Sequence, residues 1–285
     1  MFGAANGSFD LLRYDTEIAL SLWILVINAA NLALVAAAVP QDALNATARW
    51  LQQRFGSDAK TEERPSPVWD RCLPWGAALW VIAVSATFSW VIFEGIPHIP
   101  DGVSHLFQAK YLSTGRLYLP SLPDAATFEF EKLHNDGIRW FAYSFPGWPG
   151  VLSLGVLAGA PWLVNPLLAG VTVLLTHSLV AKLYNRPLAH IVILLLAVSP
   201  WFLFMSASFM SHPATVVWGL GALLAVVKAQ DSGRWVWGLV AGASLGALFL
   251  TRPHEAVFVG AAIGAWTFFL RPRLSLGSLA ALLAG

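Results

Sequence analysis

Ionisable residues stand at two places where a long apolar run gives way to a polar stretch. Asp101 comes shortly after the apolar run 75–96, and Arg252 and Glu255 follow the apolar run 235–251. A carboxylate can act as a general base towards a hydroxyl group. A guanidinium is always charged and can bind two phosphate oxygens at once. Because ionisable groups close to hydrocarbon are costly, these positions suggest a functional site.

Simpler interpretations of the same residues stay open. Asp101 follows Pro100 and precedes a predicted helix, which is ordinary capping chemistry. Arg252 and Glu255 can form a local ion pair in a short hydrated turn. His212, in the polar stretch after the run 188–206, suits either a turn or a contact to substrate.

The composition decides which class of protein must position these residues. Of the 285 residues, 57% are hydrophobic and 12% are charged, whereas soluble proteins carry about 25% charged residues. We therefore expect an all-α polytopic membrane protein in contact with the lipid bilayer. The net charge of +1 provides no field that would attract nucleic acid. The single cysteine, Cys72, excludes an internal disulfide and a site built from several thiolates.

Apolar runs of roughly 20 residues are long enough to cross a bilayer. Short loops rich in Lys and Arg are expected in the cytoplasm, which places residues 97–146, 207–212 and 252–255 together on the outer face. This orientation requires that the glycine-rich segment 150–162 lie at the outer interface without crossing. The predicted spans are 18–39, 75–96, 164–183, 188–206, 213–229, 235–251 and 255–270.

Two domains follow from this pattern. Residues 1–74 would hold one span and a charged cytoplasmic linker, and residues 75–285 would form the transmembrane module. The run 18–39 is longer than a usual signal peptide core, although Ala36–Ala38 leaves cleavage open. The final run from Leu274 is too short to cross, so we expect the sequence to stop inside a span.

The outer loop 97–146 is too long for a simple connection. From Asp101 to near Gly115 the spacing predicts an amphipathic interfacial helix, with Lys110 and Arg116 suited to headgroups or phosphate. The alternation over 128–131 and the Asn135–Gly137 turn signal predict an extended hairpin. The aromatic residues of 143–149 then return to the membrane, where such residues commonly serve as anchors.

The run PDGVSHLFQAKYLSTGRLYLP, a short hairpin and YSFPGWP resemble the polyprenyl-phosphate-sugar-dependent glycosyltransferases of the GT-C fold. That superfamily includes protein O-mannosyltransferases and lipid A aminoarabinose transferases. Two later stretches, 197–224 and 239–260, also fit. The chain departs from the pattern at Phe145-Pro146-Gly147, where relatives typically carry tandem prolines, and at Met210–Pro213, where relatives often carry an acidic residue.

The resemblance implies a GT-C-like module that transfers a sugar, with inversion, from a polyprenyl-phosphate donor to a hydroxyl acceptor on a glycan, lipid or protein. Asp101 matches the family's base, and Arg252 matches the basic residue that ends a small-residue span. The resemblance further implies a bacterial plasma membrane with the active face outward. Lys110 and Arg116 would assist Arg252 at the phosphate, and the substrate contacts would come from His105, Tyr143, His212, His254 and Glu255.

Other functions stay open at this point. A multi-pass transporter or lipid carrier would use the same small-residue spans and charged positions, and an inactive fragment of a glycosyltransferase is a further alternative. No convergent carboxylate cluster indicates a metal site, so a divalent cation is left open as a cofactor.

Overall fold

The computed structural model describes residues 68–122 and 132–267. The chain divides into two units, Met1–Asp58 and Ala59–Gly285, and all described residues belong to the second. The predicted span 18–39, the predicted strand at 128–131 and the run from Leu274 lie outside the described residues.

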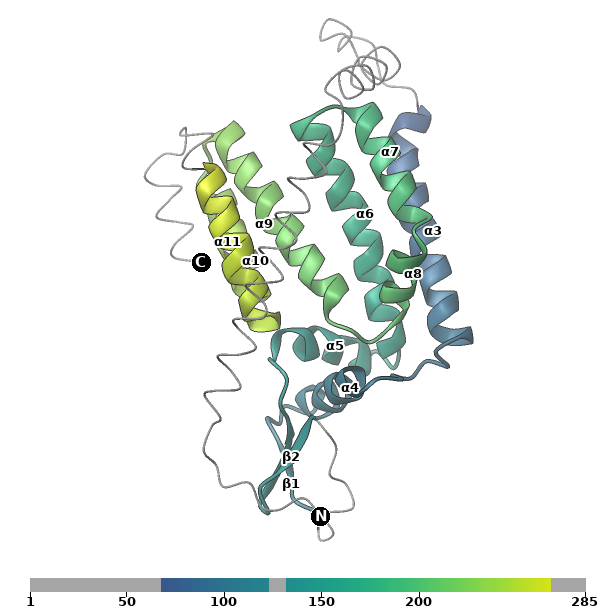
Figure 1. The fold of residues 1–285 in the computed structure, drawn as a ribbon, viewed down its shortest axis with the longest axis vertical. Helices are drawn as coiled ribbons and strands as arrows, with labels where there is room; N and C mark the ends of the chain where they lie inside the picture. Colours follow the sequence, from purple (N-terminus) through teal and green to yellow (C-terminus); the bar gives the residue numbers. More distant parts are fainter. Residues whose placement is uncertain (1–67, 123–131, 268–285) are drawn as a thin grey trace, which may run out of the picture. The chain divides into compact units, whose positions relative to one another are not determined.

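Long helices run side by side through the described part of the chain (Figure 1). Helix α6 packs against α3, α7 and α9, and α9 packs against α10. The 3-10 turn η2 (Pro161–Leu163) leads directly into α6. The helices of this bundle are α3 (Val68–Val91), α6 (Val164–Leu183), α7 (Arg186–Ala197), α8 (Pro200–Ala207), α9 (His212–Ser232), α10 (Val236–Thr251) and α11 (Pro253–Ala265).

Three of the described helices are long and apolar enough to cross a membrane: Val68–Val91, Pro161–Leu183 and His212–Ser232. The prediction of an all-α polytopic membrane protein is therefore confirmed. The predicted span 188–206 is divided into α7 and α8, which meet at an angle of 62°. The break falls at Ser199-Pro200, because proline lacks the N–H that would continue the α7 hydrogen bonds.

Helix α3 begins at Val68, earlier than the apolar run at 75 suggested. Pro74 lies within its first turns, and Asp70 and Arg71 are part of the helix although the sequence placed them in a linker. Because proline lacks an N–H, the hydrogen bond that position 74 would donate to the Asp70 carbonyl within α3 is missing.

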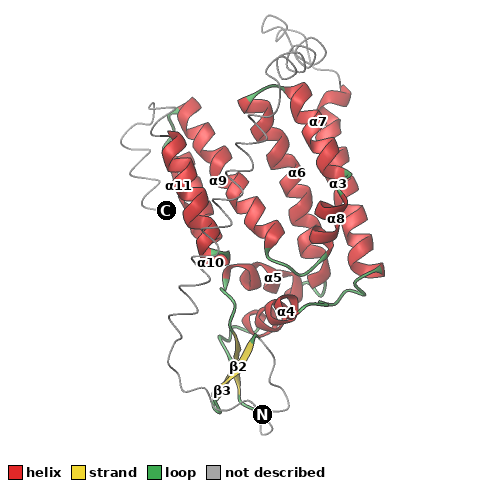
Figure 2. Cartoon of the chain, viewed as in Figure 1, coloured by secondary structure: helices red, strands yellow, loops and turns green. Residues whose placement is uncertain are grey.

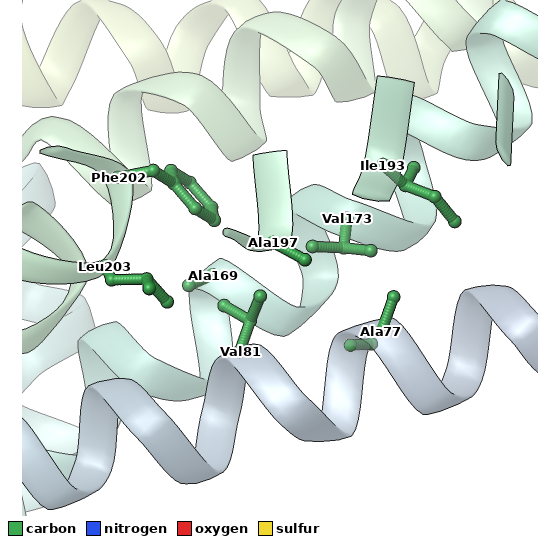
Figure 3. Close-up of a cluster of buried hydrophobic side chains, with 9 residues drawn as sticks. Ala77, Val81, Ala169, Val173, Ile193, Ala197, Phe202 and Leu203 are labelled. Atoms are coloured by element: carbon green, nitrogen blue, oxygen red, sulfur yellow. The ribbon is translucent and has the colours of Figure 1, made fainter. Parts of the chain in front are cut away.

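Small residues let the helices of the bundle approach closely. Alanines from α3, α6 and α7 alternate with larger side chains in one buried cluster (Figure 3). Close packing of this kind replaces the hydrophobic effect as the main attraction between helices in lipid. The labelled members of the cluster are Ala77, Val81, Ala169, Val173, Ile193, Ala197, Phe202 and Leu203.

Helices α4 (Pro100–Ser113) and α5 (Gly147–Leu157) lie across one end of the bundle (Figure 1). At about 1.5 Å per residue, the 11 residues of α5 span only about 16 Å, too short to cross hydrocarbon of about 30 Å. The predicted helix after Asp101 is present. Its buried residues are small or polar, such as Gly102 and Ala109, because α5 packs closely against it.

The loop 97–146 also contains the predicted hairpin, drawn as strands in Figure 2. Strand β3 (Arg139–Ala142) lies between β1 (Leu119–Pro120) and β2 (Leu133–Asn135), and both pairings are antiparallel. Asn135–Gly137 forms the turn, as predicted. The side-chain Oδ1 of Asn135 accepts a hydrogen bond from the Gly137 N–H at 3.0 Å.

Candidate functional site

Asp101 occupies the first turn of α4, where the helix dipole favours a negative charge. The N-cap position belongs to Ile99 and carries no side-chain cap, so the capping interpretation of Asp101 is wrong. Its carboxylate pairs with Lys132, with 3.3 Å between Oδ1 and Nζ, and its side chain is 41% exposed. The acid is thus accessible at the molecular surface.

His105 lies one turn after Asp101 on the same helix. Its Nδ1 is 3.4 Å from the carbonyl oxygen of Phe209. A carbonyl only accepts hydrogen bonds, so Nδ1 carries the proton and Nε2 is left as an acceptor. Burial lowers the pKa of His105 to about 4, against opposing effects of the Phe209 carbonyl and Asp101. The imidazole is therefore neutral at neutral pH.

Arg252 lies at the junction between α10 and α11, outside both helices. Its Nη1 pairs with Glu255, so the local ion pair anticipated from the sequence is present. Its Nε also donates a hydrogen bond to the Oγ of Ser211 at 3.1 Å. Arg252 is thus held by its own turn and by the segment that precedes α9.

The fold brings these distant residues to the same end of the bundle. The charges of Asp101, Arg252 and Lys132 all act on the His105 ring. The ring of His212, the first residue of α9, likewise experiences Arg252, Glu255 and Asp101. A carboxylate, a guanidinium and two imidazoles are therefore close enough to interact, and they are carried by α4, α9 and the α10–α11 junction.

Tight packing fixes the position of the α10–α11 junction relative to α5. A Cβ on Gly147 would lie 2.6 Å from the Leu250 carbonyl carbon and 2.7 Å from the Thr251 nitrogen. Only glycine leaves room for this approach. Next to it, the Nε1 of Trp148 donates to the Phe209 carbonyl at 3.0 Å. The Phe-Pro-Gly-Trp element thus supports the segments that carry Arg252 and His105.

Residues 208–210 are held by a side chain that the sequence analysis missed. Asn165, in the first turn of α6, is 2% exposed, and its Nδ2 donates to the carbonyls of Ser208 and Met210. In the sequence, the only indication of this role was that Asn165 is a polar residue within an apolar run. Lys132, the partner of Asp101, was also missed, because nothing in its sequence neighbourhood indicates that the hairpin returns to α4.

Two of the predicted phosphate contacts, Lys110 and Arg116, lie apart from this cluster. Lys110 is exposed in the last turn of α4, at the opposite end from Asp101, and Arg116 is exposed beyond that helix. Tyr143 packs with the rings of His134 and Phe141. His254 is next to the cluster in sequence, but its side chain is exposed.

An apolar cavity of about 190 Å³ adjoins the start of α4. Gly102 and Phe209 are among its lining residues, so it lies against the segments that carry Asp101 and His105. Within residues 68–122 and 132–267, no group of three or more His, Cys, Asp or Glu side chains is arranged to hold a metal ion.

Residues 151–284 match the family of dolichyl-phosphate-mannose-protein mannosyltransferases. The match covers Asn165, His212, Arg252 and Glu255, whereas Asp101 and Gly147 precede it. A comparison with curated proteins gave no match.

Proposed function

We propose that this chain transfers a sugar from a polyprenyl-phosphate donor to a hydroxyl acceptor, with inversion at the anomeric carbon. The match of residues 151–284 to the dolichyl-phosphate-mannose-protein mannosyltransferase family supports a membrane glycosyltransferase of the GT-C type. The observation that carries this proposal is that the segment 209–211 contacts both His105, one turn from Asp101, and Arg252. This arrangement combines a carboxylate open to water with a cation suited to phosphate.

In the proposed reaction, Asp101 takes the proton of the acceptor hydroxyl while the oxygen attacks the anomeric carbon. The bond between that carbon and the phosphate oxygen breaks, and its electron pair leaves with the lipid phosphate. A single displacement of this kind inverts the configuration. The phosphate is an acidic leaving group, so no strong general acid is required.

Arg252 stabilises the negative charge that develops on the departing phosphate. Its bonds to Ser211 and Glu255 fix the guanidinium before substrate arrives, which lowers the cost of ordering it. His105 and His212 offer polar contacts to the sugar or the acceptor. The Nε2 of His105 is available to accept a hydrogen bond from a hydroxyl, because Nδ1 is turned to Phe209.

The apolar cavity beside Gly102 supports a lipid-linked donor rather than a soluble nucleotide sugar. It provides apolar surface for part of an isoprenoid chain within the same segment that carries the base. We further propose that this end of the bundle faces outward in a bacterial plasma membrane. The opposite end gathers Lys182, Arg186, Lys228 and Arg234, as expected for a cytoplasmic surface.

Reconstitution tests the proposal directly. The chain is placed in liposomes with a radiolabelled polyprenyl-phosphate mannose, or with other polyprenyl-phosphate sugars, together with hydroxyl acceptors. We expect label to pass covalently to an acceptor with inverted anomeric configuration. Movement of the intact lipid between leaflets without any covalent transfer would contradict the proposal and would favour a lipid carrier.

A further inference from the structure

A second cavity, lined by both charged and apolar residues, lies at the other end of the bundle from Asp101 and Arg252. It has a volume of about 600 Å³, within the range typical of ligand sites. Its lining residues come from the beginning of α3, the second half of α6 and the beginning of α7. These three helices are neighbours in Figure 1. Neither the proposed transfer reaction nor the family match assigns a role to it.

Two arginines give this cavity an excess of positive charge. Arg71 and Arg186 both line it, and Asp70 is the single acid among its lining residues. Asp70 lies 3.6 Å from the Nη1 of Arg186, so it holds that guanidinium at the cavity wall. The Arg186 side chain is nevertheless 63% exposed, which leaves donors available for a second anionic partner.

A pair of stacked histidines lies behind the arginines. The rings of His177 and His190 are 5.2 Å apart and nearly parallel, and Asp70 is 3.3 Å from the Nε2 of His190. His177 lines the cavity, and its Nε2 is buried without a hydrogen-bond partner. A buried polar nitrogen of this kind favours a ligand that supplies the missing partner.

The rest of the wall is apolar. Pro74, Trp75 and Leu174 line the cavity beside the charged groups, and Trp75 is 62% exposed. A ligand for this site therefore needs an anionic group and an adjoining apolar part. A basic pocket between transmembrane helices on the positively charged side is the arrangement that binds anionic lipid headgroups.

We propose that this cavity binds the anionic phosphate diester headgroup of a phospholipid, with Arg71 and Arg186 at the phosphate and Trp75 against the start of the acyl chains. The site is separate from the transfer site. A lipid held there would join α3, α6 and α7 at the end of the bundle remote from the chemistry.

Native mass spectrometry of the purified chain tests this assignment, with phosphatidylglycerol and phosphatidylcholine as probes. We expect selective retention of phosphatidylglycerol, and about tenfold weaker retention in Arg186→Gln, because a charge-assisted hydrogen bond is lost. Lys182→Gln is the matched control. Lys182 is a cation at the same end of the bundle. It pairs with Asp231 and does not line the cavity.

Two further arms separate the possible outcomes. Arg186→Lys keeps the charge but not the forked donor geometry, so it should weaken retention even if Arg186→Gln fails to fold. If millimolar inorganic phosphate displaces the lipid, the cavity is a site for free phosphate and the proposal fails. If the lipid stays bound in the presence of phosphate, the cavity recognises the whole lipid, as proposed. Equal retention of both lipids, or unchanged retention in both Arg186 variants, would overturn the proposal.

Discussion

The Nε of Arg252 donates a hydrogen bond to the Oγ of Ser211 at 3.1 Å. Ser211 is 4% exposed and directly precedes α9, whereas Arg252 lies between α10 and α11. If Arg252 only formed a local ion pair with Glu255 in its own turn, this contact with Ser211 would not be needed. The bond therefore fixes the guanidinium relative to His212, which is what a preorganised phosphate site requires.

Replacing Arg252 with lysine should lower the rate of sugar transfer by about 100-fold. Lysine keeps the positive charge but cannot maintain the planar, forked contacts with Ser211, Glu255 and phosphate. The measurement is the initial rate over a range of donor concentrations. Arg234→Lys, an exposed position at the other end of the bundle, is the control. Equal rates for the two variants would remove Arg252 from the site.

Gly147→Ala should destabilise the protein by about 1–3 kcal/mol, because the added Cβ would collide with the backbone of Leu250 and Thr251. The displaced junction should also impair Arg252, so the transfer rate should fall together with the melting temperature. Gly150→Ala in the same helix is the matched control, since a Cβ there meets nothing within 4 Å. If both variants melt alike, the packing of α5 on α10 is not as described.

Asn165→Ala should lower the free energy of unfolding by about 2 kcal/mol or more. Its amide donates to two carbonyls, at Ser208 and Met210, in a buried region, and both acceptors would lose their partner. Thr87→Ala, an exposed position where the hydroxyl bonds only to its own helix, should have little effect. Thermal unfolding in detergent compares the two, and an equal loss would contradict the tethering role of Asn165.

Stability should fall as the pH drops from about 6.5 towards 4. Burial depresses the pKa of His105 from 6.5 to about 4, so the unfolded chain binds a proton in this window and the folded chain does not. The native state therefore loses stability as the solution becomes more acidic. His105→Gln should flatten this dependence of melting temperature on pH, whereas His254→Gln, at an exposed position, should leave it unchanged.

The local features of this fold were readable in the sequence. Helix α4, the turn at Asn135–Gly137 and the long apolar helices follow from residue spacing and turn chemistry, which act over a few neighbours. The bend between α7 and α8 was missed although Ser199-Pro200 marks it, because the apolar pattern continues across the break.

The long-range contacts of the site were less accessible to sequence reasoning. Asp101, Arg252 and His212 were identified from residue type and position, but the roles of Lys132 and Asn165 depend on how the hairpin and α6 pack. Lys110 and Arg116 were grouped with the phosphate contacts because they share the outer loop with Asp101. In the structure, Lys110 and Arg116 lie at or beyond the far end of α4, whereas Asp101 lies in its first turn.

Asp101→Asn tests the central claim most directly, with transfer from a labelled polyprenyl-phosphate sugar as the measurement. The change keeps the size of the side chain but removes its ability to take a proton, so the rate should fall by about 10²–10⁴-fold with the melting temperature nearly unchanged. Asp231→Asn is the matched control: that acid also pairs with a lysine and is 47% exposed, but it lies at the other end of the bundle. Full activity in a folded Asp101→Asn protein would contradict the account.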